Sequence, residues 1–310
     1  MYSFEEKIIS LKRALSEFFQ SDDFVLTEVP WGRINTNFYV LYWESKYFLR
    51  TSITKIKNDF TLWSDTDLEY YILTALWWTW ISTEVIHYHS GEDISFLLLE
   101  MILGIEPWRF SEWQESIIQT LGLFQNQDIS LFPFLKTCPL KTDFEVKIQE
   151  RMKSNTDREI ANILNTIWSK MSKLSETIQD DFCLCHNDFR ADNILLSPDR
   201  ERSWIIDIEC CIIWDRYIDI AEYYVGGIFW NNFSDLSDFD FSDYCQFLNK
   251  YGYTDSNKQL YMYLLQYCSY LSWIAAYISL EQNPHALFKD TLERNRKKYY
   301  TDMEKFVNSL

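Results

Sequence analysis

The sequence predicts an α+β protein, and three segments indicate this class. Residues 67–76 repeat apolar side chains at helical spacing, residues 95–104 are mostly apolar and have the pattern of a buried strand that ends at a glycine, and residues 194–206 have the pattern of a β-hairpin. The chain has 310 residues, of which 47% are hydrophobic, so it is long enough and apolar enough to bury a sizeable core.

Composition limits where the protein works. No uninterrupted apolar stretch of about 18 residues suggests a membrane span. The first seven residues lack the charged-then-apolar pattern of a secretion signal. The seven cysteines are odd in number and lack metal-ligand spacing, which favours reduced thiols over a disulfide framework. We therefore expect a cytoplasmic protein without a membrane span.

The formal net charge of −17 limits the class of partner. Binding to nucleic acid depends on accumulated Lys and Arg, so a nucleic-acid partner is not expected. A strongly negative protein instead raises the local concentration of cationic ligands, which favours a small cationic substrate. The aspartates at 235, 238, 240 and 243 either approach a site for such a molecule or lie on a solvated loop. The oligomeric state is left open by the sequence.

Polar side chains flank the predicted hairpin. Its apolar strand 194–196 and its return strand 204–206 are joined by a Ser-Pro-Asp turn signal. Asn193 and Asp207 therefore fall at neighbouring strand ends, and Glu209 shares a face with Asp207 if that segment is extended, because side chains alternate along a strand. Magnesium prefers such amide and carboxylate oxygens to His or Cys. We expect Asn193, Asp207 and Glu209 to hold Mg²⁺.

A further carboxylate, Asp188, precedes the hairpin in the string His186-Asn187-Asp188. A phosphoryl-transfer centre needs one carboxylate to orient the attacking hydroxyl, plus oxygen ligands that hold magnesium on the phosphates. Asp188 fits the first role, and the residues around the hairpin fit the second. The sequence therefore predicts a phosphoryl-transfer centre, in which His186 is a structural member of the loop.

These strings resemble the aminoglycoside phosphotransferase and choline kinase superfamily, also called the phosphotransferase enzyme family. The catalytic loop of that family reads His-x-Asp-x-x-x-x-Asn and its metal motif reads Ile-Asp-x-Glu or Asp-x-Asp; here they stand at 186–193 and 206–209. The wording Cys-His-Asn-Asp looks more like the choline and ethanolamine kinase branch than the antibiotic-resistance branch, which more often has Gly between His and Asp. The resemblance implies that Asp188 is the catalytic base or hydroxyl-orienting group.

The first third of the chain resembles the nucleotide-binding part of the family. Residues 31–40 are similar to its loop over the phosphates, with Gly32 and Asn35 in the pattern and Trp31 in place of a second glycine. Gly32 taken alone also fits an ordinary hairpin. Arg50 stands where the family delivers a phosphate-binding cation from a strand, and a guanidinium binds two phosphate oxygens at once.

Glu69 lies on the predicted helix 67–76, where the resemblance places a carboxylate that pairs with Arg50; a solvated helix carboxylate is the alternative. The predicted strand 95–104 resembles the family's hinge, whose backbone groups near Glu100 to Ile102 would hydrogen-bond adenine. ATP and Mg²⁺ are thus the implied cofactors. The order of loop, cation, helix, hinge, catalytic loop and metal motif agrees with kinase order.

Asp219-Ile220-Ala221 resembles the family's Asp-Leu-Ala string. In the family this aspartate braces the catalytic loop by hydrogen bonds, and the residues after it begin a helix. The resemblance therefore implies that Asp219 is a structural residue whose carboxylate caps that helix.

Aromatic residues make up 18% of the chain and include 13 Trp. A quaternary ammonium is held by aromatic faces, each contact contributing roughly 0.5–2 kcal/mol. The C-terminal segment is rich in Tyr and Trp and loosely resembles the late helix of choline kinases. Spacing of three and four residues is, however, also what any core-facing helical stripe shows. The candidates for acceptor binding are Tyr217, Tyr224, Trp230 and Trp273.

The resemblance implies a protein-kinase-like, two-lobed fold. A nucleotide-binding lobe with an antiparallel sheet would span residues 1–104, a larger and mainly helical catalytic and acceptor-binding lobe would span 105–310, and ATP would lie between them. The implied function is ATP-dependent phosphorylation of the hydroxyl of a small cationic amino-alcohol such as choline or ethanolamine. An aminoglycoside phosphotransferase and a non-catalytic, pseudokinase-like binding protein are the alternatives.

Overall fold

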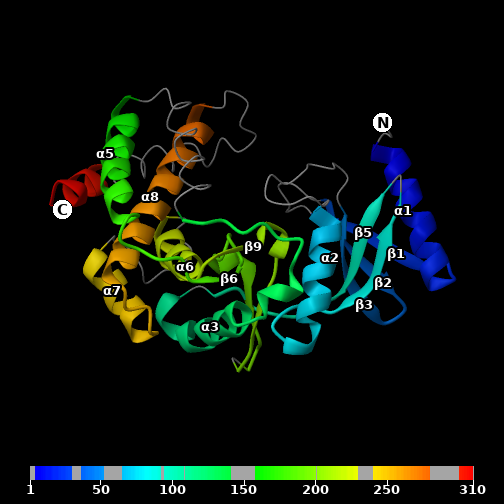
Figure 1. Ribbon diagram of the computed structural model, residues 1–310. Helices are drawn as coiled ribbons and strands as arrows, with labels where there is room; N and C mark the ends of the chain where they lie inside the picture. Colours follow the sequence, from blue (N-terminus) through cyan, green and yellow to red (C-terminus); the bar gives the residue numbers. More distant parts are fainter. Residues whose placement is uncertain are drawn as a thin grey trace. The chain divides into compact units, whose positions relative to one another are not determined.

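A five-stranded antiparallel sheet is the centre of the N-terminal part of the chain (Figure 1). In spatial order its strands are β1 Phe24–Val29, β2 Thr36–Tyr42, β3 Ser45–Thr51, β5 Ser95–Glu100 and β4 Val85–Ser90. The structure is a computed structural model that describes residues 4–29, 36–51, 65–91, 94–107, 109–140, 158–199, 201–229, 240–279 and 300–309.

Two helices cover the opposite faces of this sheet, α1 Phe4–Phe19 and α2 Asp65–Leu76 (Figure 1). Leu49 of β3 is paired with Leu98 of β5, and both belong to the apolar cluster beneath α1. Because successive side chains of a strand point to opposite faces, Arg50 faces α2 instead. The predicted helix at 67–76 is confirmed, and the predicted strand at 95–104 is confirmed over its first six residues.

The predicted hairpin is also confirmed, since β7 Ile194–Leu196 pairs antiparallel with β8 Ser203–Ile205. The expectation that Asp207 and Glu209 share one face of an extended segment is wrong. Asp207 adopts a left-handed backbone, with φ 61° and ψ 47°, and a short helix, η4 Ile208–Cys210, follows it. Aspartate tolerates this conformation better than most residues, so the chain turns sharply where the apolar pattern suggested a strand.

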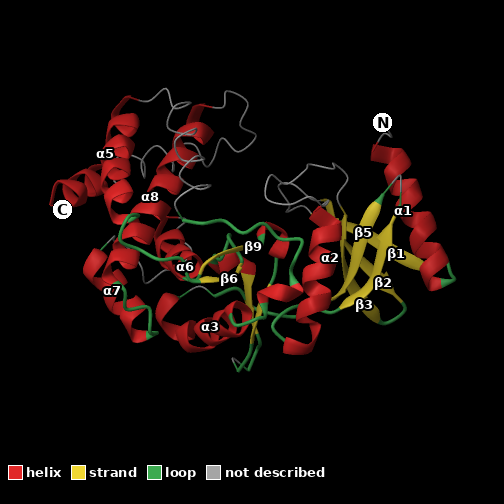
Figure 2. Ribbon diagram, in the orientation of Figure 1, coloured by secondary structure: helices red, strands yellow, loops and turns green. Residues whose placement is uncertain are grey.

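The remaining elements are mainly helical (Figure 2). The helices are α3 Phe110–Gln125, α5 Arg158–Leu174, α6 Tyr217–Phe229, α7 Phe241–Lys250 and α8 Ser256–Ser279, and residues 300–309 are helical as well. A two-stranded sheet joins β6 Phe182–Cys185 to β9 Ile212–Asp215. The short helices are η1 Trp77–Thr79, η2 Ile129–Leu131 and η3 Ala191–Asn193.

Helix α8 packs against α5 and α6, and its tyrosines are part of the core. Tyr261, Tyr263 and Tyr267 are almost completely buried. Core packing is therefore the correct interpretation of this aromatic stripe for the three residues. The combination of a sheet-based part and a helical part confirms the expected α+β class.

The chain forms two units, each more connected internally than to the other. Unit 1 contains Met1–Pro107, Glu115–Lys136 and Asn193–Ile212, and unit 2 contains Trp108–Gln114, Thr137–Asp192 and Ile213–Leu310. The lobe boundary expected at residue 104 remains a prediction. All seven cysteines are free. None of the helices in the described ranges has the length and apolar content needed to cross a bilayer.

Candidate functional site

Arg50 is the centre of a buried charge cluster in unit 1. Its Nε lies 2.8 Å from Oε2 of Glu69 on α2, and its Nη2 lies 2.5 Å from Oδ1 of Asp207 and also contacts Oε2 of Glu209. The side chains of Arg50, Glu69 and Glu209 are only 9%, 4% and 11% exposed. The expected pairing of Glu69 with Arg50 is confirmed, and the alternative of a solvated carboxylate is wrong.

The cluster sets one guanidinium against three carboxylates. Burial alone lowers the pKa of Arg50, but the charges of Glu69, Asp207 and Glu209 outweigh this effect and raise that pKa well above its usual value. Arg50 therefore stays charged. With all three carboxylates ionised the cluster keeps an excess of negative charge, which is the environment that a divalent cation requires.

The candidate magnesium ligands belong to the same unit. The backbone oxygen of Asn193 accepts a hydrogen bond from the Ile206 amide at 3.0 Å, so Asn193 and Asp207 stem from the paired ends of the β7–β8 hairpin. Among the described residues, no group of three or more His, Cys, Asp or Glu side chains is arranged as a metal site by itself. An amide and carboxylates offer only oxygen atoms, and this donor chemistry fits Mg²⁺.

The loop that carries Asp188 lies in unit 2, and helix α6 holds it. The backbone amides of His186 and Asn187 donate to the two carboxylate oxygens of Asp219, each at 2.9 Å, and Asp219 is fully buried. The brace expected of Asp219 is therefore present. Asn187, the residue before Asp188, has a left-handed backbone with φ 62°.

The expectation that the Asp219 carboxylate caps its own helix is wrong. Asp219 is the third residue of α6, and its oxygens bind amides that lie more than 30 residues earlier. At the start of the helix it is Asp215 whose Oδ1 accepts a hydrogen bond from the Tyr217 amide, at 3.0 Å. Asp215, which precedes the helix, therefore accepts from an amide of its first turn, whereas both oxygens of Asp219 are engaged by the catalytic loop.

Arg190 holds the candidate catalytic carboxylate. Its Nε donates to Oδ1 of Asp188 at 2.8 Å, its Nη2 donates to Oδ2 of Asp188 at 3.4 Å, and Nη2 also lies 3.2 Å from Oδ2 of Asp192. The Asp188 side chain keeps 31% of its surface exposed. Arg190 is not among the residues that the sequence pattern selects, although its place two residues after Asp188 is a signal that could have found it.

Beneath this loop lies Glu222 of α6, another residue that sequence reasoning misses. Its Oε2 accepts from the Phe189 amide and its Oε1 accepts from the Tyr270 hydroxyl, both at 3.2 Å. Burial, together with the charges of Asp188 and Asp219, raises the pKa of Glu222 to about 8, against an opposing effect of Arg190. The signal in the sequence is a second carboxylate on an otherwise apolar helix.

Glu222→Gln is expected to become more stabilising as the pH rises. The native state keeps the Glu222 proton up to a pH of about 8, whereas the unfolded chain releases it near 4.5. The free energy of unfolding of the wild type therefore falls across this window, and the Gln variant avoids the loss. Between pH about 5 and about 8, the stability of the variant relative to wild type should rise by at least about 1.4 kcal/mol.

Urea unfolding at several pH values measures this difference. Glu304→Gln, which also removes one carboxylate but at an exposed position, is the matched control. A Glu222→Gln curve that runs parallel to that of the control across the window would contradict a neutral Glu222 in the native state.

The hinge residues lie at the end of β5. The amide of Glu100 donates to the Glu84 oxygen, and its carbonyl accepts from the Thr83 hydroxyl, both at 2.9 Å. The backbone of Glu100 is thus engaged within unit 1, whereas Ile102 follows the strand in irregular, half-exposed backbone. The adenine contact expected at these residues remains a prediction, and of the two Ile102 is the better placed for it.

Four of the expected binding residues cannot be placed in full. Gly32 and Asn35 of the phosphate loop and Trp230 lie outside the described residues. Trp273 lies on α8, where the backbone is described but the side chain is not. Their roles remain predictions.

The other two acceptor candidates are mostly buried. The Tyr217 hydroxyl accepts from the Asp255 amide at 3.0 Å, and Tyr224 stands edge-on to Phe110 with ring centroids 5.3 Å apart. Tyr224 also borders a pocket of about 360 Å³ in unit 2. The other residues of its lining are Phe110, Gln114, Asp243, Gln246, Phe247 and Lys250. Both tyrosines are held by core packing, and an acceptor role for them remains a prediction.

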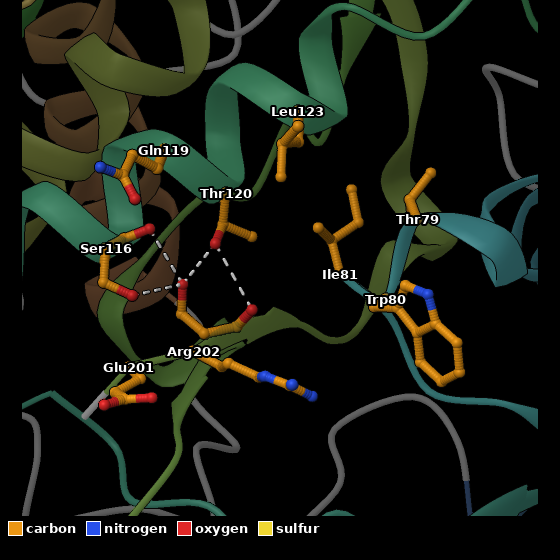
Figure 3. Close-up of a pocket in the computed structure, with 10 residues that line it drawn as sticks. Thr79, Trp80, Ile81, Ser116, Gln119, Thr120, Leu123, Glu201 and Arg202 are labelled. Carbon is orange, nitrogen blue, oxygen red and sulfur yellow. Dashed lines mark hydrogen bonds between the residues drawn. The ribbon is translucent and has the colours of Figure 1, made fainter. Parts of the chain in front are cut away.

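A pocket of about 450 Å³ in unit 1 contains none of the candidate residues (Figure 3). Its polar wall is made of hydroxyl groups that bind one another, since Ser203 Oγ lies 2.5 Å from Thr120 Oγ1 and 3.3 Å from Ser116 Oγ. The remaining lining residues are Thr79, Trp80, Ile81, Gln119, Leu123, Glu201 and Arg202. The candidate catalytic and metal-binding residues lie instead at the Arg50 cluster, the β7–β8 hairpin and the Asp188 loop.

Comparison with solved structures shows which proteins share this fold. Choline kinase LicA from Streptococcus pneumoniae matches with a TM-score of 0.67 and 16% identity, over 99% of this chain and 100% of that one. An ethanolamine kinase from Plasmodium vivax matches with a TM-score of 0.65 and 16% identity, over 96% and 89%. A thermostable mutant of aminoglycoside phosphotransferase APH(4)-Ia matches with a TM-score of 0.63 and 14% identity, over 96% and 98%.

At such low identities the three structures establish the fold alone, and they confirm the expected kinase-like class with a sheet-based N-terminal part and a helical C-terminal part. No curated protein matches the sequence. The pattern that defines the phosphotransferase enzyme family, in contrast, matches residues 25–247, which is well over half of the chain. This match confirms the resemblance first read from the catalytic-loop and metal motifs. The chain therefore belongs to the phosphotransferase enzyme family.

Proposed function

We propose that this protein is an ATP-dependent kinase that phosphorylates the hydroxyl of a small cationic molecule of the choline or ethanolamine type. The observation that carries the proposal is the Arg50 cluster. There Arg50 of β3 contacts Glu69 of α2 and the two carboxylates of the metal motif, Asp207 and Glu209. Binding of a metal–triphosphate requires such a combination of a cation and carboxylates.

Unit 1 supplies the groups that would handle the nucleotide. Arg50 offers a guanidinium fork to phosphate oxygens while Glu69 holds its Nε side. Asn193 and Asp207 would hold Mg²⁺, with Glu209 as a further ligand, and the bound ion neutralises the charge of the phosphates. The use of ATP is supported by solved relatives, since one structure of LicA holds AMP and one of APH(4)-Ia holds ADP.

Unit 2 supplies the group that would handle the acceptor. The Asp188 carboxylate would accept a hydrogen bond from the acceptor hydroxyl and aim the oxygen lone pair at the terminal phosphoryl group. A bond then forms between that oxygen and phosphorus, the bond from phosphorus to the ADP oxygen breaks, and the hydroxyl proton leaves through Asp188. Asp219 keeps the loop in place for this step through the two amides that precede Asp188.

Two observations support a cationic acceptor. The net charge of −17 draws cations toward the protein. Choline kinase and ethanolamine kinase are among the structures that share the fold, and both of the molecules in those names are positively charged at neutral pH. Hygromycin B, an aminoglycoside that is bound in one of the APH(4)-Ia structures, is the comparison acceptor.

ADP release in the presence of ATP and Mg²⁺ tests the proposal. Choline or ethanolamine should raise the rate at least about tenfold above the rate without acceptor, whereas dimethylbutanol, the uncharged carbon isostere of choline, should not. Stimulation by hygromycin B alone would transfer the assignment to an aminoglycoside phosphotransferase. ATP binding without stimulation by any of these acceptors would refute the proposal and favour a non-catalytic binding protein.

A further inference from the structure

Arg190 restricts how the Asp188 carboxylate can turn. Two nitrogens of one planar guanidinium bind the two oxygens of one carboxylate, at 2.8 and 3.4 Å. A contact at two points opposes rotation about the bond to the carboxyl carbon, whereas a contact at one point leaves that rotation free. The direction in which Asp188 offers its oxygen atoms is therefore coupled to the position of Arg190.

Arg190 is itself confined. Its side chain is only 15% exposed, and the carboxylates of Asp188 and Asp192 lie on its polar end. Burial lowers the pKa of Arg190, but neighbouring negative charges, led by Asp188 and Asp192, outweigh this and raise it above the usual value. Arg190 is therefore a permanent cation with little freedom to leave the loop.

Residues of α6 and α8 support the loop segment that carries Arg190. Tyr270 of α8 donates its hydroxyl to Glu222, and the other oxygen of Glu222 accepts from the amide of Phe189, the residue between Asp188 and Arg190. Glu222 thus binds the backbone of the loop with one oxygen and the hydroxyl of a buried tyrosine with the other. These two hydrogen bonds fix the position of the loop relative to α6.

Gly226 leaves the space that the hydrogen bond between Tyr270 and Glu222 requires. It lies four residues after Glu222 on α6, which places it on the same face of the helix. A Cβ added at Gly226 would lie 2.5 Å from the Tyr270 hydroxyl oxygen and 3.6 Å from Cγ of Arg190. The first distance is far below any van der Waals contact. The absence of a side chain at this position is what lets Tyr270 reach Glu222 beside the Arg190 stem.

We infer that Arg190 is a positioning residue, which holds the Asp188 carboxylate in the orientation that receives the acceptor hydroxyl. Glu222 and Tyr270, whose hydrogen bond needs the space left at Gly226, hold Arg190 and its loop in place. The inference rests on the proposed function. It adds residues to the site beyond the catalytic-loop motif, in which Arg190 stands at an unspecified position and to which Glu222, Gly226 and Tyr270 do not belong.

Substitution at Arg190 separates positioning from binding. Arg190→Met keeps the stem and removes the guanidinium, and it should lower kcat about 30-fold while the Kd for ATP changes less than about twofold. Arg190→Lys keeps the charge without the fork and should recover only part of that loss. The KM for the acceptor should change little. A loss that appears in ATP affinity instead of kcat would overturn the inference, as would full recovery by Lys.

Substitution at Gly226 tests the support without touching a charged group. Gly226→Ala should lower kcat about fivefold, because the new methyl group displaces the Tyr270 hydroxyl and the Arg190 stem. Gly122→Ala is the matched control, since it lies in α3 and no heavy atom lies within 4 Å of its added Cβ. Equal kcat values for the two alanine variants would overturn the role of the support.

If the methyl group of Gly226→Ala prevents folding, Tyr270→Phe serves in its place. It removes only the hydroxyl that binds Glu222 and leaves the ring, and it should produce a similar loss of kcat. A Phe variant with wild-type kcat would likewise overturn the role of the support.

A double-mutant cycle decides the central contact without any turnover. Arg190→Met, Asp188→Asn and their combination are unfolded in urea without substrates, and the two sites should be coupled by at least about fivefold in the unfolding equilibrium constant. Absence of coupling would overturn the inference even if the wild type proves to be an active kinase. A wild type without turnover would refute the proposed function, and the cycle would still decide whether Arg190 holds Asp188.

Discussion

Asp188→Asn is expected to lower acceptor-dependent phosphoryl transfer by about a hundred- to ten-thousand-fold. The amide has the same shape as the carboxylate, but it does not take a proton from the acceptor hydroxyl and orients it poorly. Asp188 is 31% exposed, asparagine keeps an oxygen for the Arg190 guanidinium, and Asp192 remains beside Arg190, so the fold should persist. Steady-state rates with the stimulating acceptor measure the loss, and equilibrium binding of ATP, measured separately, should change little.

Asp22→Asn is the matched control for this substitution, because Asp22 is exposed and lies in the turn before β1. It should retain wild-type rates. An Asp188→Asn protein that also keeps them would remove Asp188 from the mechanism. Equal losses of ATP binding and of rate would mean that Asp188 acts on the nucleotide rather than on the acceptor.

Arg50→Met is expected to destabilise the protein by about 3–5 kcal/mol, the usual effect of removing one partner from a buried charge pair. Methionine fills the space of the stem but leaves three carboxylates without their cation. Most of the stability loss should come from Glu69 and Glu209, because they are nearly buried and water cannot replace the lost charge. Urea unfolding measures the stability loss, and ATP affinity should fall in the same variant.

Arg202→Met is the control for loss of one arginine, since Arg202 is exposed and should contribute within about 0.5 kcal/mol. Arg50→Lys should fall between the two, because a single ammonium group does not match the fork that reaches Glu69 with one nitrogen and Asp207 and Glu209 with another. Equal stability of the Arg50→Met and Arg202→Met proteins would mean that the cluster does not depend on its cation.

Local patterns were enough to predict much of the fold. Helix α2, strand β5 and the β7–β8 hairpin follow from the spacing of apolar residues and from turn residues, all within short windows of sequence. The pairing of Arg50 with Glu69 followed from the family order of strand and helix, and the structure confirms it. For the helix, the strand and the hairpin the information lies within the segment itself, whereas the ion pair needed the family order.

The errors and omissions share a physical cause. The left-handed turn at Asp207 breaks a strand pattern at a single residue, and the side chain of Asp207 pairs there with Arg50, more than 150 residues away, a contact that no local pattern contains. Glu222 has the sequence appearance of a solvated helix carboxylate, yet its partial burial and the charges of Asp188 and Asp219 raise its pKa to about 8. Burial by distant segments leaves little local mark in the sequence, here only a second carboxylate on an otherwise apolar helix.

The left-handed backbone at Asn187 changes how the two branches of the family are to be compared. The amides of His186 and Asn187 bind the carboxylate of Asp219, and Asn187, directly before Asp188, has a left-handed backbone conformation. Glycine and asparagine are the residue types that adopt such a conformation most readily. A glycine at position 187 would meet the same torsional demand as Asn187, so an asparagine here is explained by the backbone without reference to the acceptor.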